Sequence, residues 1–308
     1  MGTTKEVLEK LKGLDASKLL AVVDLFGSRE NLEACLRGEK EIALKDASRS
    51  LVDHTGRLIP AHLGITCAVC DENRDFHIQQ PEINYAKILA HYVEFFPEGI
   101  RFPTASEFED KAEASMKSLL KNKLISNLVK RVHIPLPLPY QVITNYGVCM
   151  QYFFLPVLEL AYKKHFPARK FVNRPNDKLL GKISILPNMG QDRLISGMAK
   201  GPGMAWYFPN SMQGFSVLAQ RQAMGMLLQN GLTLAGAIEP ALGFIGYSKE
   251  LASDENTPGY ECSAVSFDPS LESFFFWALS DGLVFECYEF GCMRTAHDYY
   301  SGGLVFIG

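Results

Sequence analysis

Two apolar runs separated by a short turn near the C-terminus constrain the fold more than any other feature of this sequence. The first run is Phe274 to Leu279, the second is Leu283 to Tyr288, and Ser280-Asp281-Gly282 stands between them. Both runs are rich in aromatic and β-branched residues, and Asp-Gly suits the tight turn of a hairpin because glycine accepts a positive φ. The sequence therefore predicts a β-hairpin, and with it an antiparallel sheet in this part of the chain.

Further β signals surround this hairpin. We expect strands over 262–267 and over 304–307, the latter beside an aromatic strand such as 274–279, and a helix near 220–229. The run from Ile134 to Pro139 has proline at every second position, so it cannot be helical. We expect it to run extended as a stiff connector. A proline-rich ligand for a partner's aromatic groove is the alternative interpretation.

The first half of the chain has helical spacing. Thr3-x-x-Glu6 and Thr104-x-x-Glu107 each have the form of a capping box before apolar residues at helical intervals. We also expect helices between Ser28 and Gly38, over 82–96, and over 140–165 with a kink at Pro156.

This distribution predicts the fold class. Because the strands cluster instead of alternating with helices, the sequence predicts an α+β fold. A helical N-terminal region, residues 1–165, precedes a β-rich, mainly antiparallel-sheet C-terminal region, residues 166–308. The two regions are expected to form separate domains or to share one core.

Composition limits the compartment and the partners. A net charge of -3 over 308 residues gives no positive field that would attract nucleic acid or an acidic membrane, so we expect neither as a partner. The longest apolar stretches, 231–247 and 148–162, are interrupted by proline and glutamate, so no membrane span is expected. Seven cysteines in a chain without a secretory signal indicate reduced thiols and a cytoplasmic protein.

A metal site is one candidate. His62, Cys67, Cys70 and His77 lie within sixteen residues, and two thiolates with two imidazoles could supply the four ligands of a structural zinc ion. The competing interpretation is a buried strand over 63–70, in which residues three apart point to opposite faces and cannot share one ion.

Cys292 and His297 form a candidate nucleophile and base, because a catalytic thiolate needs an imidazole within reach. A structural role competes with this hypothesis, since closeness in sequence shows neither contact nor orientation.

The segment 190–214 holds five glycines around Lys200, Trp206 and Tyr207. Backbone N–H groups of a glycine-rich loop can approach a phosphate, and aromatic side chains beside glycines suit a small-molecule pocket. Neither G-x-G-x-x-G nor the P-loop pattern is present. The alternative is a series of turns between strands, with Trp206 in the core.

No motif outweighs its structural interpretation, so the sequence leaves open whether the chain is an enzyme. We expect a ligand- or protein-binding module whose partner the sequence does not identify. The alternatives are a hydrolase or transferase with its site between the two regions, near 190–214, and a protein with structural zinc at 62–77.

Overall fold

The computed structural model describes residues 29–37, 39, 50–76, 78–253, 256–288 and 292–307. Residues 1–47 and 48–308 form two compact units, and each is considered by itself. In the first unit, helix α3 (Arg29–Leu36) confirms the helix expected between Ser28 and Gly38. The capping box expected at Thr3 lies outside the described residues.

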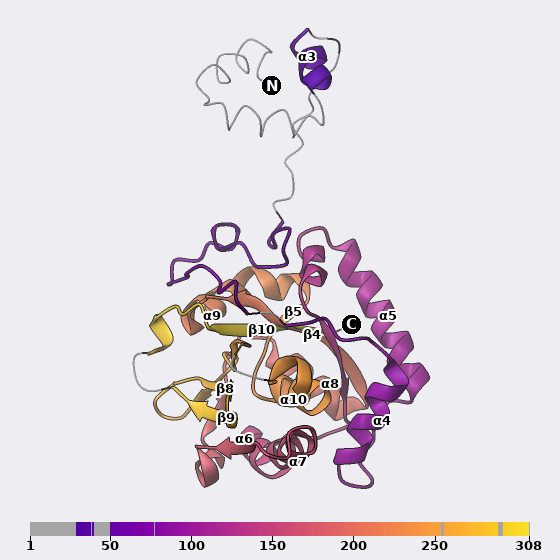
Figure 1. The fold of residues 1–308 in the computed structure, drawn as a ribbon, viewed down its shortest axis with the longest axis vertical. Coiled ribbons are helices and arrows are strands. Elements are labelled where there is room, and N and C mark those ends of the chain that lie inside the picture. The colour runs from indigo at the N-terminus through magenta and orange to yellow at the C-terminus, as the bar shows by residue number, and fades with distance from the viewer. Residues whose placement is uncertain are drawn as a thin grey trace. The chain divides into compact units, whose positions relative to one another are not determined.

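The second unit contains the remaining helices and strands (Figure 1). Its α-helices are α4 (Tyr85–Phe95), α5 (Ala105–Lys121), α6 (Tyr146–Cys149), α7 (Leu155–His165), α8 (Gln191–Lys200), α9 (Val217–Leu227) and α10 (Ile238–Leu251). Its strands are β1 (Ile134–Leu138), β2 (Lys170–Asn173), β3 (Ile183–Ile185), β4 (Gly203–Gln213), β5 (Leu232–Leu234), β6 (Gly259–Glu261), β7 (Val265–Phe267), β8 (Phe274–Leu279), β9 (Gly282–Cys287) and β10 (Tyr300–Phe306).

One large sheet organises this unit. Within the described residues it has eight strands, in the order β1-β4-β10-β6-β8-β9-β2, and β5 also pairs with β10. The pairs β10–β6 and β2–β9 are parallel, whereas the other pairs of this sheet are antiparallel. Helices predominate in the first half of the chain and strands in the second, so the predicted α+β fold is confirmed.

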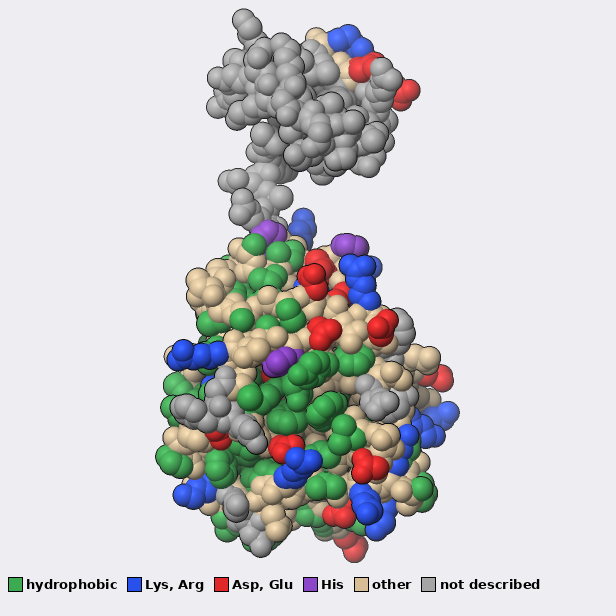
Figure 2. All heavy atoms as spheres, turned by 60° about the vertical axis from the view of Figure 1, so that its left-hand side comes forward, with side chains coloured by type: hydrophobic (Ala, Val, Ile, Leu, Met, Phe, Trp, Pro, Cys, Tyr) green, Lys and Arg blue, Asp and Glu red, His purple; other side chains and the backbone are tan. Residues whose placement is uncertain are grey.

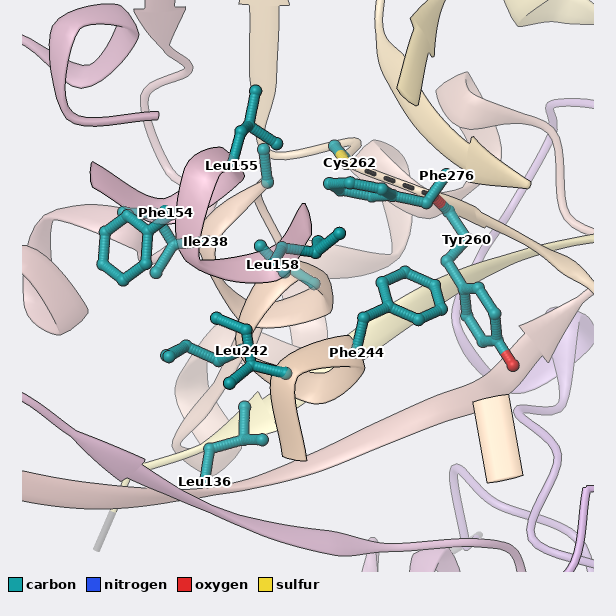
Figure 3. Packing of buried hydrophobic residues seen from close by; sticks show 14 of the residues in the cluster. Leu136, Phe154, Leu155, Leu158, Ile238, Leu242, Phe244, Tyr260, Cys262 and Phe276 are labelled. Carbon is teal, nitrogen blue, oxygen red and sulfur yellow. Dashed lines mark hydrogen bonds between the residues drawn. The ribbon is translucent and has the colours of Figure 1, made fainter. Parts of the chain in front are cut away.

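The core joins residues from both halves of the sequence. Leu155 and Leu158 of α7 belong to the same buried cluster as Ile238 and Leu242 of α10 and Phe276 of β8 (Figure 3). Helix α10 is buried along most of its length and lies in the middle of the unit (Figure 1). Within the second unit, residues from both 48–165 and 166–308 therefore contribute to one core, and whether either expected region folds alone stays a prediction.

The hairpin is confirmed, but its turn is shifted. β8 and β9 pair with Leu279 opposite Gly282, so Ser280 and Asp281 form the turn. Gly282 belongs to β9 and has no positive φ. A Cβ there would lie 2.0 Å from the carbonyl oxygen of Lys170, so glycine is required by the close approach of β2.

The expected connector of alternating prolines is a strand. β1 is buried throughout and pairs with β4 at one end of the sheet order. An edge strand tolerates Pro135 and Pro137, because its side without a neighbouring strand requires no backbone donor.

The C-terminal strand exists, and the aromatic strand beside it is β4 instead of the strand over 274–279 named as an example. β10 pairs with β4, β5 and β6, and not with the aromatic strand β8. All its residues are buried, which suits the interior of a sheet covered on both faces.

The helix expected over 140–165 is shorter and irregular. It begins at Tyr146, where the Asn145 side chain accepts a hydrogen bond from the N–H of Val148. A π-helical turn over Met150–Phe154 precedes Pro156 in the first turn of α7. The irregularity expected at this proline is therefore a change of helix type.

Candidate functional site

A pocket of about 920 Å³ lies beside α5 and α8, and we call it the α5–α8 pocket. The ends of β1 and β10, the start of β4 and the segment before β5 complete its walls. Its volume falls within the range typical of small-molecule sites, roughly 300–1,000 Å³.

Glycines set the position of α8 along the pocket. Gly190, with φ of 85°, precedes the helix, and a Cβ on it would lie 2.7 Å from the Thr233 hydroxyl of β5. Gly201 ends the helix, and Gly203 begins β4. The series of turns expected over 190–214 is therefore wrong, because two of these glycines mark the ends of a helix instead of turns between strands.

Helix α5 supplies a polar wall. Its start is fixed by the predicted capping box, in which Thr104 and Glu107 exchange hydrogen bonds. Four polar residues of α5 or its C-cap then line the pocket at spacings of four, three and four, which places them on one helix face. They are Lys111, Ser115, Ser118 and Asn122. The Asn122 Nδ2 donates to Asn230 Oδ1 at 3.0 Å, so the side chain at the end of this wall is held in place.

Ser115 is the unusual member of this wall. It is 2% exposed, and its Oγ has no hydrogen-bond partner among the described residues. A buried hydroxyl without a partner costs about 1–3 kcal/mol relative to one that is satisfied. Ser115 is therefore a polar group in the pocket wall that lacks a partner.

The rim of the α5–α8 pocket is basic. Lys111 Nζ donates to the carbonyl oxygen of Pro202 at 3.1 Å, which holds it against the turn between α8 and β4. Lys200, two residues before Pro202, is exposed and also lines the pocket. None of the described lining residues is acidic, so both lysines favour a negatively charged group here.

The strands and α8 add apolar side chains to the pocket lining. They include Leu138, Leu194, Met204 and Phe306, which come from β1, α8, β4 and β10. These side chains are largely buried, so their packing fixes the shape of the wall. The pocket thus combines these apolar side chains with polar groups from α5, from Lys200 and from the segment before β5.

The structure separates the three ligand-binding candidates of segment 190–214. Lys200 lines the α5–α8 pocket, whereas Trp206 and Tyr207 do not. Trp206 is buried in β4, as the core interpretation expected, and its Nε1 donates to the Ala112 carbonyl of α5 at 3.0 Å. Tyr207 is buried in the cluster that includes α10.

The sequence analysis missed Lys111 and Ser115. A signal for these two residues was present in the sequence. Polar residues at positions 111, 115, 118 and 122 form one stripe on a helix that also has a buried apolar face. An exposed polar stripe looks the same as one that lines a pocket, since both follow helical spacing.

The zinc candidate is described only in part. His77 lies outside the described residues, and elsewhere in the described chain no group of three or more His, Cys, Asp or Glu side chains is placed to hold a metal ion. His62 Nδ1 lies 2.7 Å from the Ser50 carbonyl oxygen. The four-ligand site stays a prediction.

The competing interpretation of this segment, a buried strand over 63–70, is wrong. Residues 63–70 form turns and a single bridge between Val69 and Phe215. The backbone N–H groups of Cys67 and Cys70 bind the Gln222 side chain and the Gly214 carbonyl, so this segment docks on α9 and the end of β4 without a regular ladder.

Cys292 and His297 lie in an aromatic part of the surface. Cys292 is exposed in a 3₁₀ turn, and the His297 ring stacks on Tyr299 at 5.0 Å between centroids. Tyr299 in turn stacks on Trp277 at 6.3 Å. Figure 2 shows hydrophobic side chains gathered in the middle of one face of the second unit, with charged side chains around them. No described contact joins the Cys292 thiol to the imidazole of His297, and their catalytic pairing stays a prediction.

Two buried carboxyl groups lie away from the α5–α8 pocket. Glu239 binds the side chain of Gln191, and Glu261 accepts a hydrogen bond from Tyr288 Oη at 2.6 Å. Burial raises the pKa of each carboxyl to about 7. Since neither lines the pocket, we assign them to the stability of the fold.

Comparison with protein-family models, curated proteins and solved structures gave no match. Among the described helices, none has the length and apolarity needed to cross a membrane.

Proposed function

We propose that this protein is a ligand-binding module that holds a small molecule in the α5–α8 pocket. The observation that carries the proposal is the pocket itself, about 920 Å³ in volume, in which polar groups of α5 stand beside apolar side chains of β1, α8, β4 and β10. A pocket of this size that combines apolar side chains with a few polar groups is typical of small-molecule sites.

The composition of the pocket favours binding over hydrolysis or group transfer. No described lining residue is His, Cys, Asp or Glu, the usual general bases and nucleophile partners. The Lys111 ammonium is engaged by the Pro202 carbonyl and not by a serine hydroxyl. A hydrolase or transferase near 190–214 is therefore the weaker proposal.

The proposal includes a cytoplasmic location. The cysteines within the described residues are free thiols, which supports a reducing compartment.

The experiment is a fluorescence titration with the uncharged probe N-phenyl-1-naphthylamine. We expect saturable binding of one probe per chain, because the pocket offers an apolar wall of suitable size. The Gly197→Phe variant should weaken binding at least about tenfold, a difference of about 1.4 kcal/mol, since residue 197 lines the pocket and a phenyl ring would occupy it.

Gly225→Phe is the matched control. Gly197 and Gly225 are both exposed helical glycines, and a Cβ at either position meets nothing within 4 Å. Of these two glycines, only Gly197 lines the pocket. If both variants bind the probe as the wild type does, with unchanged circular dichroism, the probe binds elsewhere and the proposal is wrong.

A further inference from the structure

We infer that the ligand of the α5–α8 pocket is an organic anion with an apolar body, whose charged group binds at Lys111 and Lys200. This inference rests on the proposed function, because it assumes that the pocket binds a small molecule. It adds the chemical class of that molecule and its orientation.

The position of the charged group follows from the two lysines. Lys111 Nζ is fixed at the Pro202 carbonyl, and Lys200 lies two residues before Pro202 on the same turn. An ammonium group has three donors, and the Pro202 carbonyl uses one from Lys111. The remaining donors of both lysines can bind a carboxylate or a phosphate, and no described acidic side chain in the lining competes for them.

The apolar body follows from the hydrocarbon part of the pocket lining. Leu138, Leu194 and Met204 present hydrocarbon beside the rim, and Phe306 continues this surface at the end of β10. An inorganic anion would leave this wall in contact with water, whereas a hydrocarbon body would cover it. The pocket therefore fits a molecule that is charged at one end and apolar along one side.

The hydrogen-bonding wall gives the ligand its second contact. Ser118 lies on the same face of α5, about two helical turns from Lys111, and its side chain is exposed in the pocket lining. An oxygen along the ligand, such as an ester oxygen, could accept a hydrogen bond from this hydroxyl.

The test measures displacement of N-phenyl-1-naphthylamine by three molecules with the same alkyl chain: octanoate, octyl phosphate and octyl glucoside. We expect the two anions to displace the probe at about tenfold lower concentration than the uncharged glucoside. The advantage should shrink between 0.05 and 0.5 M NaCl, since salt screens exposed charges. Tighter binding of octyl phosphate than of octanoate would identify a phosphate ester as the ligand, and the reverse order would identify a carboxylate.

Two lysine variants locate the charged group. Lys111→Gln and Lys200→Gln remove one positive charge each. At position 111, glutamine also keeps a donor for the Pro202 carbonyl. Each should weaken displacement by the anions about fivefold and leave octyl glucoside unchanged, a modest factor because the lysines are partly solvated. Lys117→Gln is the control, because Lys117 is exposed on α5 outside the pocket lining.

The outcomes distinguish this inference from the proposed function. If octyl glucoside displaces the probe as well as the anions do, or if the lysine variants resemble Lys117→Gln, the anionic class is wrong and the pocket still binds small molecules. If Gly197→Phe leaves all titrations unchanged, the pocket is not the binding site, and both proposals are wrong.

Discussion

Replacing Ser115 by alanine should make the free protein more stable. The side chain lies on α5 with 2% exposure, and its Oγ has no partner within the described residues. Removing an unsatisfied buried hydroxyl recovers part of a cost of about 1–3 kcal/mol. Alanine also exceeds serine in helix propensity by up to about 0.7 kcal/mol. We expect Ser115→Ala to raise the free energy of unfolding by about 1–2 kcal/mol.

Urea denaturation with and without octanoate measures both consequences. The midpoint should rise in Ser115→Ala with an unchanged slope, and the affinity for octanoate should stay the same, because the hydroxyl is enclosed in the wall. Ser118→Ala is the matched control, because Ser118 is exposed on the same helix and gains only the propensity contribution, about 0.5 kcal/mol. If Ser115→Ala is no more stable than Ser118→Ala, the hydroxyl already has a partner such as ordered water, and the argument from an unsatisfied hydroxyl is wrong.

Two further predictions concern the fold. Burial raises the pKa of Glu261 to about 7 from 4.5. An acid with a raised folded-state pKa stabilises the fold fully below its unfolded pKa, and this contribution is lost as pH rises to about 7. Because Glu239 has a similarly raised pKa and titrates in both proteins, the wild type should lose up to about 3 kcal/mol more than Glu261→Gln, and parallel pH profiles for the two proteins would contradict this. Gly282→Ala should cost more than about 2 kcal/mol, because the new Cβ would lie 2.0 Å from a backbone oxygen of β2. Gly225→Ala should be neutral or stabilising, because a Cβ at Gly225 meets nothing within 4 Å. Equal melting temperatures for Gly282→Ala and Gly225→Ala would refute the packing argument.

Local signals in the sequence predicted local structure. The capping box at Thr104 and Glu107 requires only neighbouring residues, so it was visible before α5 was known. The β8–β9 hairpin was visible for the same reason, since its strands are joined by a short turn. The role of Gly282 was not visible, because it depends on the close approach of Lys170, more than a hundred residues away in the chain. The sequence analysis attributed Gly282 to a positive φ in the turn, whereas the structure attributes it to the lack of space for a Cβ.

The α5–α8 pocket shows the same limit at the level of function. Lys200 was visible as a candidate because it stands among glycines in one segment. Lys111 stands on a helix nearly ninety residues earlier, and only the fold brings both lysines into the lining of one pocket, where Lys111 binds the Pro202 carbonyl. Ser115 looks like an ordinary helical serine in the sequence, and only the folded structure shows that it is buried and that its hydroxyl has no partner among the described residues. Chemistry assembled from α5, α8 and four strand ends leaves no local motif, so the candidate site depends on the fold.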